Sequence, residues 1–257
     1  MSTVTGRIKQ VEQPIEGFAP PSTFEVTQYD DKLLLNEPEN IHPNVVGMTV
    51  DYMTRAQLGV PLIEAFHISL LGWKNAKLYE NYEHNLGGAE KLLKNIHGLS
   101  DKAIMSAYGM ACYDVWYRNP IAAQKKPILV PDKKTIDNMR IMIKRSLNFF
   151  QQHGPVIKTE FTFEGGYTPT VCAGDGDYLT KDTLWDMKVS KNKINKKQTL
   201  QLLMYWIMGQ HSGKPEFKDV KKVGIFNPRL NTKYVLAMSE IPEYYIREIE
   251  KRVICYE

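Results

Sequence analysis

The chain has 257 residues, of which 43% are hydrophobic and 24% are charged, with a formal net charge of +4. This is ordinary globular composition, so it excludes a disordered or collagen-like chain. Three widely spaced cysteines predict a reducing compartment, and they are too few for a four-cysteine zinc or iron–sulfur cluster. No apolar run is long enough to span a bilayer and no secretory signal is evident, so we expect a cytoplasmic protein with no membrane partner.

The chain order predicts three regions. Residues 1–43 are rich in proline and predict an extended arm, and residues 44–130 predict a helical region packed on the core. Helices are expected near 45–58, 61–72, 87–97 and 100–117, with glycines separating these four segments. The remaining residues, 131–257, form the expected core and carry a net charge of +6, against −2 for residues 1–130.

The core begins with an apolar stripe at intervals of three and four, from Ile136 to Phe150, which predicts an amphipathic helix ended by Gly154 and Pro155. The period then changes to two, which is typical of strands. We expect strands over 156–163, 169–179, 182–190, 221–227 and 233–238, a helix over 197–211 and a final helix from Pro242 to about Val253. The second and third strands form an antiparallel hairpin. This order predicts an α/β, or mixed α+β, fold.

Charged residues gather on this hairpin. Alternation along the third strand places Trp185 and Met187 on one face and sets Asp186 and Lys188 side by side on the other. Asp177 ends the neighbouring strand, where it can approach Asp186. Its substitute, if the register differs by two residues, is the acid at position 175, Asp175, on the same strand face.

This grouping suits phosphodiester cleavage. Two carboxylates close together repel one another unless a cation lies between them, and Mg²⁺ or Mn²⁺ prefers carboxylate and carbonyl ligands. Such a metal polarises the phosphate and helps to generate hydroxide. Lys188 can orient the attacking water or neutralise the charge that develops on the phosphate.

Acid-x-Lys triplets are common in this chain, but the triplet at Asp186 alone combines an apolar strand, an upstream GxxD that ends at Asp177, and a downstream QxxxY formed by Gln201 and Tyr205. In this combination, over residues 133–238, the chain resembles the PD-(D/E)xK nuclease superfamily, and the QxxxY helix is similar to that of its RecB-like branch. The resemblance implies a restriction-endonuclease-like core, with a central mixed sheet flanked by helices, plus a helical N-terminal region.

The resemblance also implies roles for the site residues. Asp177 and Asp186 would bind Mg²⁺ or Mn²⁺, with the backbone carbonyl of Met187 as a further ligand, and Lys188 would assist the water. Gln201 and Tyr205, which share one helix face, would hold the substrate strand; the alternative for these two is an ordinary helix edge.

The chain departs from the family pattern in two respects. Many relatives of this branch carry an iron–sulfur cluster, for which this chain has too few cysteines. Many members also place a histidine on an N-terminal helix, and the sequence does not choose among three candidates, namely His67, His84 and His97.

Further candidate residues surround the hairpin. Glu160, on the polar side of the first strand, is either an additional metal ligand or a solvated acid. Four lysines follow the site directly and would contact DNA phosphates in a salt-sensitive way, with a solvated loop as the alternative for each: Lys191, Lys193, Lys196 and Lys197.

We therefore expect a metal-dependent deoxyribonuclease. The resemblance to the QxxxY branch favours exonuclease over endonuclease, and no base-reading module argues otherwise. No P-loop is present, so separating the DNA strands would need a partner protein, either a helicase or a recombination or defence protein. A phage or another mobile element is the expected setting. The alternative is a catalytically silent nuclease-fold module that binds nucleic acid or a protein. The sequence does not indicate an oligomeric state.

Overall fold

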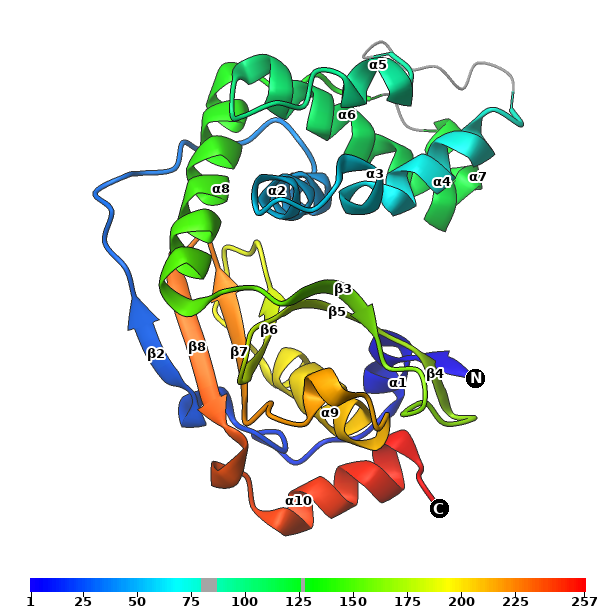
Figure 1. The fold of residues 1–257 in the computed structure, drawn as a ribbon, viewed down its shortest axis with the longest axis vertical. Coiled ribbons are helices and arrows are strands. Elements are labelled where there is room, and N and C mark those ends of the chain that lie inside the picture. Colours follow the sequence, from blue (N-terminus) through cyan, green and yellow to red (C-terminus); the bar gives the residue numbers. More distant parts are fainter. Residues whose placement is uncertain (80–86, 126–127) are drawn as a thin grey trace. The chain divides into compact units, whose positions relative to one another are not determined.

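The computed structural model describes residues 1–79, 87–125 and 128–257 (Figure 1). No helix in these three ranges has both the length and the apolar character that crossing a membrane requires.

The chain forms two compact units. The sheet unit comprises residues 1–29 and 149–257, and the helical unit comprises residues 30–148. The units therefore divide after Tyr29 and after Asn148, whereas the sequence pattern placed divisions after residues 43 and 130. The first 29 residues thus fold together with the C-terminal part of the chain.

The helical unit contains most of the expected helices. They are α2 (Pro43–Gln57), α3 (Leu62–Ala65), α4 (His67–Ala76), α5 (Ala89–Leu93), α6 (Asp101–Arg118), α7 (Pro120–Lys125) and α8 (Lys133–His153), whose last residues belong to the sheet unit. The expected segment 61–72 divides at Phe66, and the proline-rich segment 119–132 contains α7, which begins at Pro120. Proline suits a first helical position because its missing N–H has no partner there in any case.

Two contacts set the packing of α6. Its first turn is capped by Ser100, whose Oγ accepts a hydrogen bond from Ala103 N at 3.2 Å. Helix α4 lies so close to α6 that a Cβ at Gly72 would come within 1.9 Å of the carbonyl oxygen of Tyr113. A glycine is required at that crossing.

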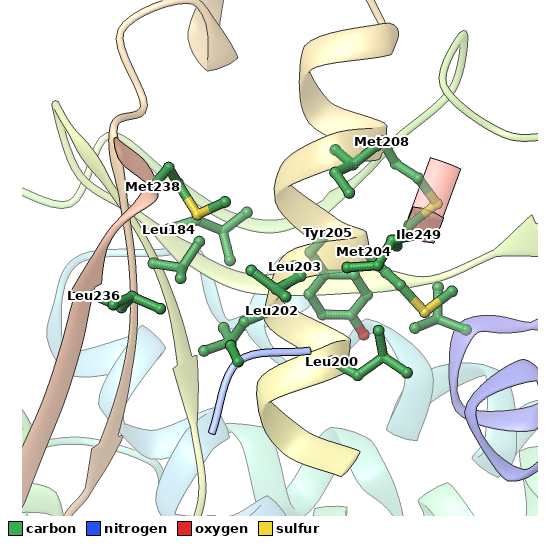
Figure 2. Close-up of a cluster of buried hydrophobic side chains, with 14 of the residues drawn as sticks. Leu184, Leu200, Leu202, Leu203, Met204, Tyr205, Met208, Leu236, Met238 and Ile249 are labelled. Carbon is green, nitrogen blue, oxygen red and sulfur yellow. The ribbon is translucent and has the colours of Figure 1, made fainter. Parts of the chain in front are cut away.

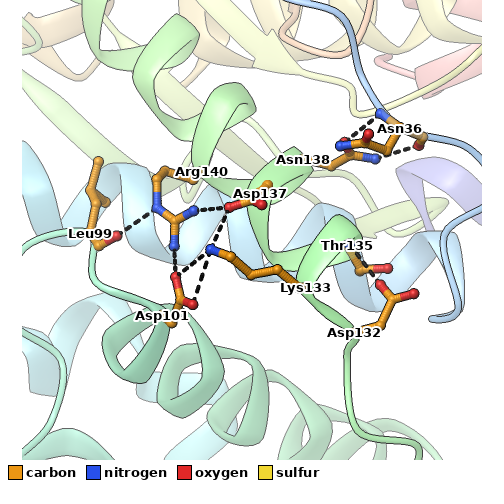
Figure 3. Close-up of polar contacts among 9 residues, drawn as sticks. All are labelled: Asn36, Leu99, Asp101, Asp132, Lys133, Thr135, Asp137, Asn138 and Arg140. Carbon is orange, nitrogen blue, oxygen red and sulfur yellow. Dashed lines mark hydrogen bonds and ion pairs between the residues drawn. The ribbon is translucent and has the colours of Figure 1, made fainter.

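A polar network joins the start of α6 to α8 (Figure 3). Arg140 forms ion pairs with Asp101 and Asp137, and its Nε donates to the carbonyl oxygen of Leu99 at 2.8 Å. Lys133 Nζ lies 2.9 Å from Asp137 Oδ1 and 3.1 Å from Asp101. Within the same stretch of α8, Asn138 forms hydrogen bonds with both the backbone and the side chain of Asn36.

The sheet unit is built on a six-stranded sheet of order β2-β8-β7-β6-β5-β3. The strands are β2 (Glu25–Gln28), β3 (Lys158–Thr162), β5 (Asp175–Leu179), β6 (Thr183–Met187), β7 (Lys222–Asn227) and β8 (Thr232–Ala237). Strands β6 and β7 are parallel and all other neighbours are antiparallel. The expected α/β class, with a central mixed sheet flanked by helices, is confirmed.

The N-terminal 29 residues are not the extended arm that their prolines predicted. They contain β1 (Ser2–Thr3), α1 (Val4–Gln10) and a 3₁₀ turn (Pro21–Thr23), and then β2, which pairs with β8 at the sheet edge. The expected strand 169–179 also divides, at Gly174, into β4 (Val171–Ala173) and β5. Strand β1 pairs with β4 in parallel, so tertiary pairing overrode the local signal in both places.

The core of this unit lies between the sheet and α9 (Lys196–His211) (Figure 2). Leucines and methionines of α9 pack against the sheet side chains Leu184 and Leu236 and against Ile249 of the C-terminal helix. That last helix runs as α10 (Glu243–Glu248) and continues as a π-helical segment (Ile249–Ile254), while further 3₁₀ turns span Pro215–Phe217 and Met238–Glu240. On the opposite sheet face, Phe149 stacks on Phe226 with ring centroids 4.1 Å apart.

Candidate active site

The register of the hairpin brings two acids together. Strands β5 and β6 are antiparallel with Tyr178 opposite Trp185, so continuing that register by one residue sets Asp177 opposite Asp186. The backbone ladder does not continue there. Instead, Asp177 Oδ2 accepts a hydrogen bond from the backbone N–H of Met187 at 2.7 Å. The side chain of Asp177 thus takes the place of a strand carbonyl and is fixed beside the end of β6.

The alternation predicted for β6 is confirmed. Trp185 packs against Phe149 on one face, with ring centroids 4.9 Å apart, whereas Leu184 belongs to the core beneath α9. Asp186, two residues after Leu184, lies on the α9 face. Its side chain meets that of Lys188, whose Nζ donates to Asp186 Oδ1 at 2.8 Å.

Asp186 is an unusually buried acid. Only 2% of the residue is exposed, and its Oδ2 makes no hydrogen bond among the described residues, although Lys188 Nζ lies 2.8 Å away as an ion pair. A buried carboxylate oxygen normally has a hydrogen-bond partner, because desolvating it otherwise costs free energy. The arrangement therefore maintains a buried acceptor at the point where the two acids meet.

Helix α9 places a tyrosine over these acids. Gln201 Nε2 donates to the hydroxyl of Tyr205 at 2.7 Å, so the predicted pair shares one helix face. Burial raises the pKa of Tyr205 well above its ordinary value, and the charges of Asp186 and Asp177 raise it further. The phenol consequently stays protonated at neutral pH. Its ring stacks on Phe163, with centroids 5.0 Å apart, which holds it in place.

Glu160 and Asp175 occupy outer positions. The register of β3 with β5 sets Glu160 opposite Asp177, but Glu160 is exposed and has a left-handed backbone with φ +48°. Asp175 is also exposed, and its charge contributes only a minor part of the raised pKa of Tyr205. The inner acid of β5 is therefore Asp177, as the GxxD spacing indicated.

The four candidate lysines differ in their surroundings. Lys196 is half-buried at the start of α9, and its Nζ donates to the carbonyl oxygens of Ile15 at 3.1 Å and Pro14 at 3.3 Å. It holds the N-terminal segment against this helix. The other three are exposed in the loop after β6 or on the first turn of α9: Lys191, Lys193 and Lys197.

None of the three candidates for the family's N-terminal histidine lies among the described residues of the sheet unit. His67 and His97 belong to the helical unit, and His84 lies outside the described residues.

Two supporting residues were missed by the sequence reasoning. Asn227, buried at the end of β7, donates to the carbonyl oxygen of Ser190 at 2.8 Å and so fixes the loop that follows Lys188. Tyr167 donates to the carbonyl oxygen of Gly174 at 2.7 Å, at the break before β5. Neither had a spacing signal, because Asn227 contacts a loop 37 residues away in sequence and Tyr167 lies in an irregular segment to which no helix or strand period applies.

The residues present fit a divalent cation. Asp177 and Asp186 are adjacent acids on neighbouring strands, and the backbone N–H of Met187 donates a hydrogen bond to Asp177. Asp186 also has a buried carboxylate oxygen, Oδ2, that makes no hydrogen bond among the described residues. These are hard oxygen donors of the kind that Mg²⁺ and Mn²⁺ bind. Within residues 1–79, 87–125 and 128–257, no three His, Cys, Asp or Glu side chains form a metal-holding group, so the set would rest on two carboxylates.

Comparison of the chain with protein-family models, curated proteins and solved structures finds no match in any of the three.

Proposed function

We propose that the protein is a metal-dependent deoxyribonuclease of the PD-(D/E)xK type, and that it acts as a RecB-like exonuclease. The observation that supports this most directly is the meeting of Asp177, Asp186 and Lys188 beneath Tyr205. A solvated hairpin would expose these groups, whereas here Asp186 is almost fully buried. A buried, charge-paired acid beside a tyrosine whose pKa is strongly raised is the kind of arrangement that catalytic sites contain.

Each residue has a role that follows from its contacts. Asp177 and Asp186 would hold Mg²⁺ or Mn²⁺ together with the carbonyl of Met187, and a bound divalent cation neutralises phosphate charge and activates water. Lys188, positioned by its bond to Asp186, would orient the attacking water and stabilise the charge that develops on the phosphate. Tyr205 stays protonated, so it can donate a hydrogen bond instead of adding a third negative charge.

The proposed substrate is DNA. The exposed lysines 191, 193 and 197 follow the site and would bind backbone phosphates, which makes binding salt-sensitive and independent of sequence. We place the enzyme in the cytoplasm, in phage recombination, defence or repair, with a helicase or a recombination protein as the partner that separates strands.

The test is digestion of linear and covalently closed circular DNA, each single- and double-stranded, with Mg²⁺ or Mn²⁺. We expect cleavage of linear DNA alone, and a loss of about a hundredfold or more in Lys188→Ala, because a preorganised charge stabiliser is removed. Lys181→Ala, which changes an exposed lysine in the turn between β5 and β6, is the matched control and should retain nearly full activity. Cleavage of closed circles would change the assignment to endonuclease.

The alternative, a silent module that only binds, makes a different prediction. If neither the unchanged protein nor Lys188→Ala cleaves any substrate, thermal unfolding with and without Mg²⁺ or Mn²⁺ tests whether a metal site exists. A rise in melting temperature that Asp186→Ala abolishes would indicate a functional metal site. No rise and no cleavage would contradict the nuclease proposal.

A further inference from the structure

The helical unit contains a cavity that the proposed nuclease chemistry does not use. Its volume is about 530 Å³, and its walls comprise α2 with the two residues before it, α6, α7 and residues 128–129. Most of the lining residues are apolar, and they include Met48, Tyr108 and Trp116, whose sulfur and rings pack well against a flat aromatic body. This size and lining are typical of small-molecule sites, in which a few polar groups orient a mostly apolar ligand.

One carboxylate oxygen at this cavity has no hydrogen-bond donor. Asp114 lines the cavity and is fully buried. Its Oδ2 accepts hydrogen bonds from Arg118 Nε and from the hydroxyl of Tyr52, both at 3.1 Å. Its Oδ1 makes no hydrogen bond among the described residues. A buried carboxylate oxygen without a donor costs free energy, so the site favours an occupant that supplies one.

The backbone donors at the opposite wall are already in use. Pro43, the first residue of α2, has no N–H. Asn44 N donates to His42 Nδ1 at 3.2 Å, and Val45 N donates to the carbonyl oxygen of the same histidine at 2.9 Å. Among the described lining residues, the buried side-chain nitrogen or oxygen that lacks a hydrogen bond is Asp114 Oδ1. The cavity therefore lacks a donor and has an acceptor to offer.

The charges at the cavity cancel one another. Asp114 and Arg118 are the acid and the base among the described lining residues, and they form an ion pair at 3.1 Å. An anion would bring further acceptors to a site that lacks a donor, and a cation would lie close to the guanidinium. An uncharged group that donates one hydrogen bond meets neither cost.

We propose that this cavity binds an uncharged, flat and mostly apolar molecule with one N–H or O–H donor, which donates to Asp114 Oδ1 while its body lies against Trp116 and Met48. Indole is a minimal probe of this class. The site lies wholly within the helical unit, and the proposal is independent of the nuclease proposal.

The experiment is calorimetric titration of the whole chain with indole, benzofuran and tryptamine. We expect saturable binding of indole. Benzofuran has the shape of indole, but an oxygen replaces the N–H, so it should bind at least about tenfold more weakly. Tryptamine adds a positive charge and should bind no more tightly than indole, because Arg118 already neutralises Asp114.

Asp114→Asn tests the acceptor with little change of shape. Tyr52 and Arg118 both donate to Asp114, so the amide oxygen should stay with them and the amide nitrogen should take the place of Oδ1. The cavity then presents a donor, and the preference for indole over benzofuran should disappear. The matched control is Asp137→Asn, which changes an acid that also pairs with an arginine of its own helix but does not line the cavity. It should keep the preference.

Ala123→Trp leaves the ion pair of Asp114 intact and fills the cavity, so it should abolish indole binding. Circular dichroism checks that both cavity variants fold. The proposal is overturned if indole does not bind, if benzofuran binds as tightly as indole, or if tryptamine binds more tightly. It is also overturned if a folded Asp114→Asn keeps the preference for indole, or if a folded Ala123→Trp binds indole unchanged.

Discussion

The two units position their polar residues by different means. In the sheet unit, the register of β5 and β6 sets Asp177 beside Asp186, and one hydrogen bond from Met187 holds the first acid in place. In the helical unit, side chains far apart in sequence meet directly. Arg145 Nε donates to Asp31 Oδ2 at 2.7 Å, across more than a hundred residues.

The difference affects what each unit can tolerate. Backbone hydrogen bonds hold a pair of strands together and thereby position the side chains. A site residue on such a pair can therefore be substituted without loss of the fold. A helix pair depends on the contact itself, because helices are joined only through their side chains. We therefore expect changes at the sheet site to affect activity first, and changes at the helical contacts to affect stability first.

Asp186→Asn should have the largest effect. It removes a metal-binding charge, so we expect nuclease activity to fall by about a hundredfold or more while the free energy of unfolding without metal changes by about 1 kcal/mol or less. Lys188, which is 29% exposed, can turn toward solvent once its partner is neutral. DNA digestion and urea unfolding provide the two measurements. Full activity in this variant would contradict a role for Asp186 in catalysis.

Two glycine substitutions compare the units directly. A Cβ at Gly224 would lie 2.2 Å from the Trp185 ring, and one at Gly72 would lie 1.9 Å from the carbonyl oxygen of Tyr113. Each change to alanine should lower the free energy of unfolding by about 3 kcal/mol, because the neighbouring atoms must move.

Hydrogen exchange distinguishes the two variants. Gly224→Ala should lose protection first in β6 and β7, and Gly72→Ala first in α4 and α6. Equal loss throughout both units in either variant would contradict the division into separately packed units.

Asp31→Asn tests a helical-unit contact of intermediate strength. Arg145 hydrogen bonds to Asp31 and holds the pKa of that carboxyl below its usual value. The pKa of Asp31 is lower in the folded protein than in the unfolded chain. The ion pair therefore stabilises the fold at pH values above the unfolded-state pKa, and this stabilisation is lost as the pH falls through the folded-state pKa. We expect a loss of about 1–2 kcal/mol at pH 7.

The pH profile provides the control for this prediction. The difference between Asp31→Asn and the unchanged protein should shrink as pH falls below about 4, where the carboxyl takes up its proton. A difference that persists at pH 2 would show that packing, not charge, is responsible.

Asp101→Asn should have the smallest effect. Lys133 and Arg140 lower the pKa of Asp101, but the carboxyl is exposed at the surface of the network in Figure 3. Solvent screens such pairs. We expect a change in melting temperature close to the detection limit, and one that disappears in 1 M NaCl. A large, salt-insensitive loss would mean that this network is structurally essential.

Local patterns were sufficient for much of the sheet unit. The period of two along β6 predicted that Asp186 faces away from Trp185, and the four-residue spacing predicted that Gln201 and Tyr205 share a helix face. Both features depend on backbone geometry that every strand and helix repeats. The roles of these residues in catalysis stay predictions.

Other features were decided by tertiary structure alone. The N-terminal segment looked extended, yet it supplies β2 to the sheet edge, where β8 provides its hydrogen bonds. The pairing of Arg118 with Asp114 follows helix spacing, but the cavity beside it required α2 and α7 to be in place.

The sequence by itself thus determined most of the helices and strands after residue 43, the alternation of β6 and the helix face that Gln201 and Tyr205 share, since these follow from short-range periodicity. Which strands neighbour one another, how deeply Asp186 is buried, and where a cavity lies depended on contacts between distant segments. Such contacts form only when whole elements pack, because the apolar surface that drives packing is buried collectively and leaves no local pattern in the chain.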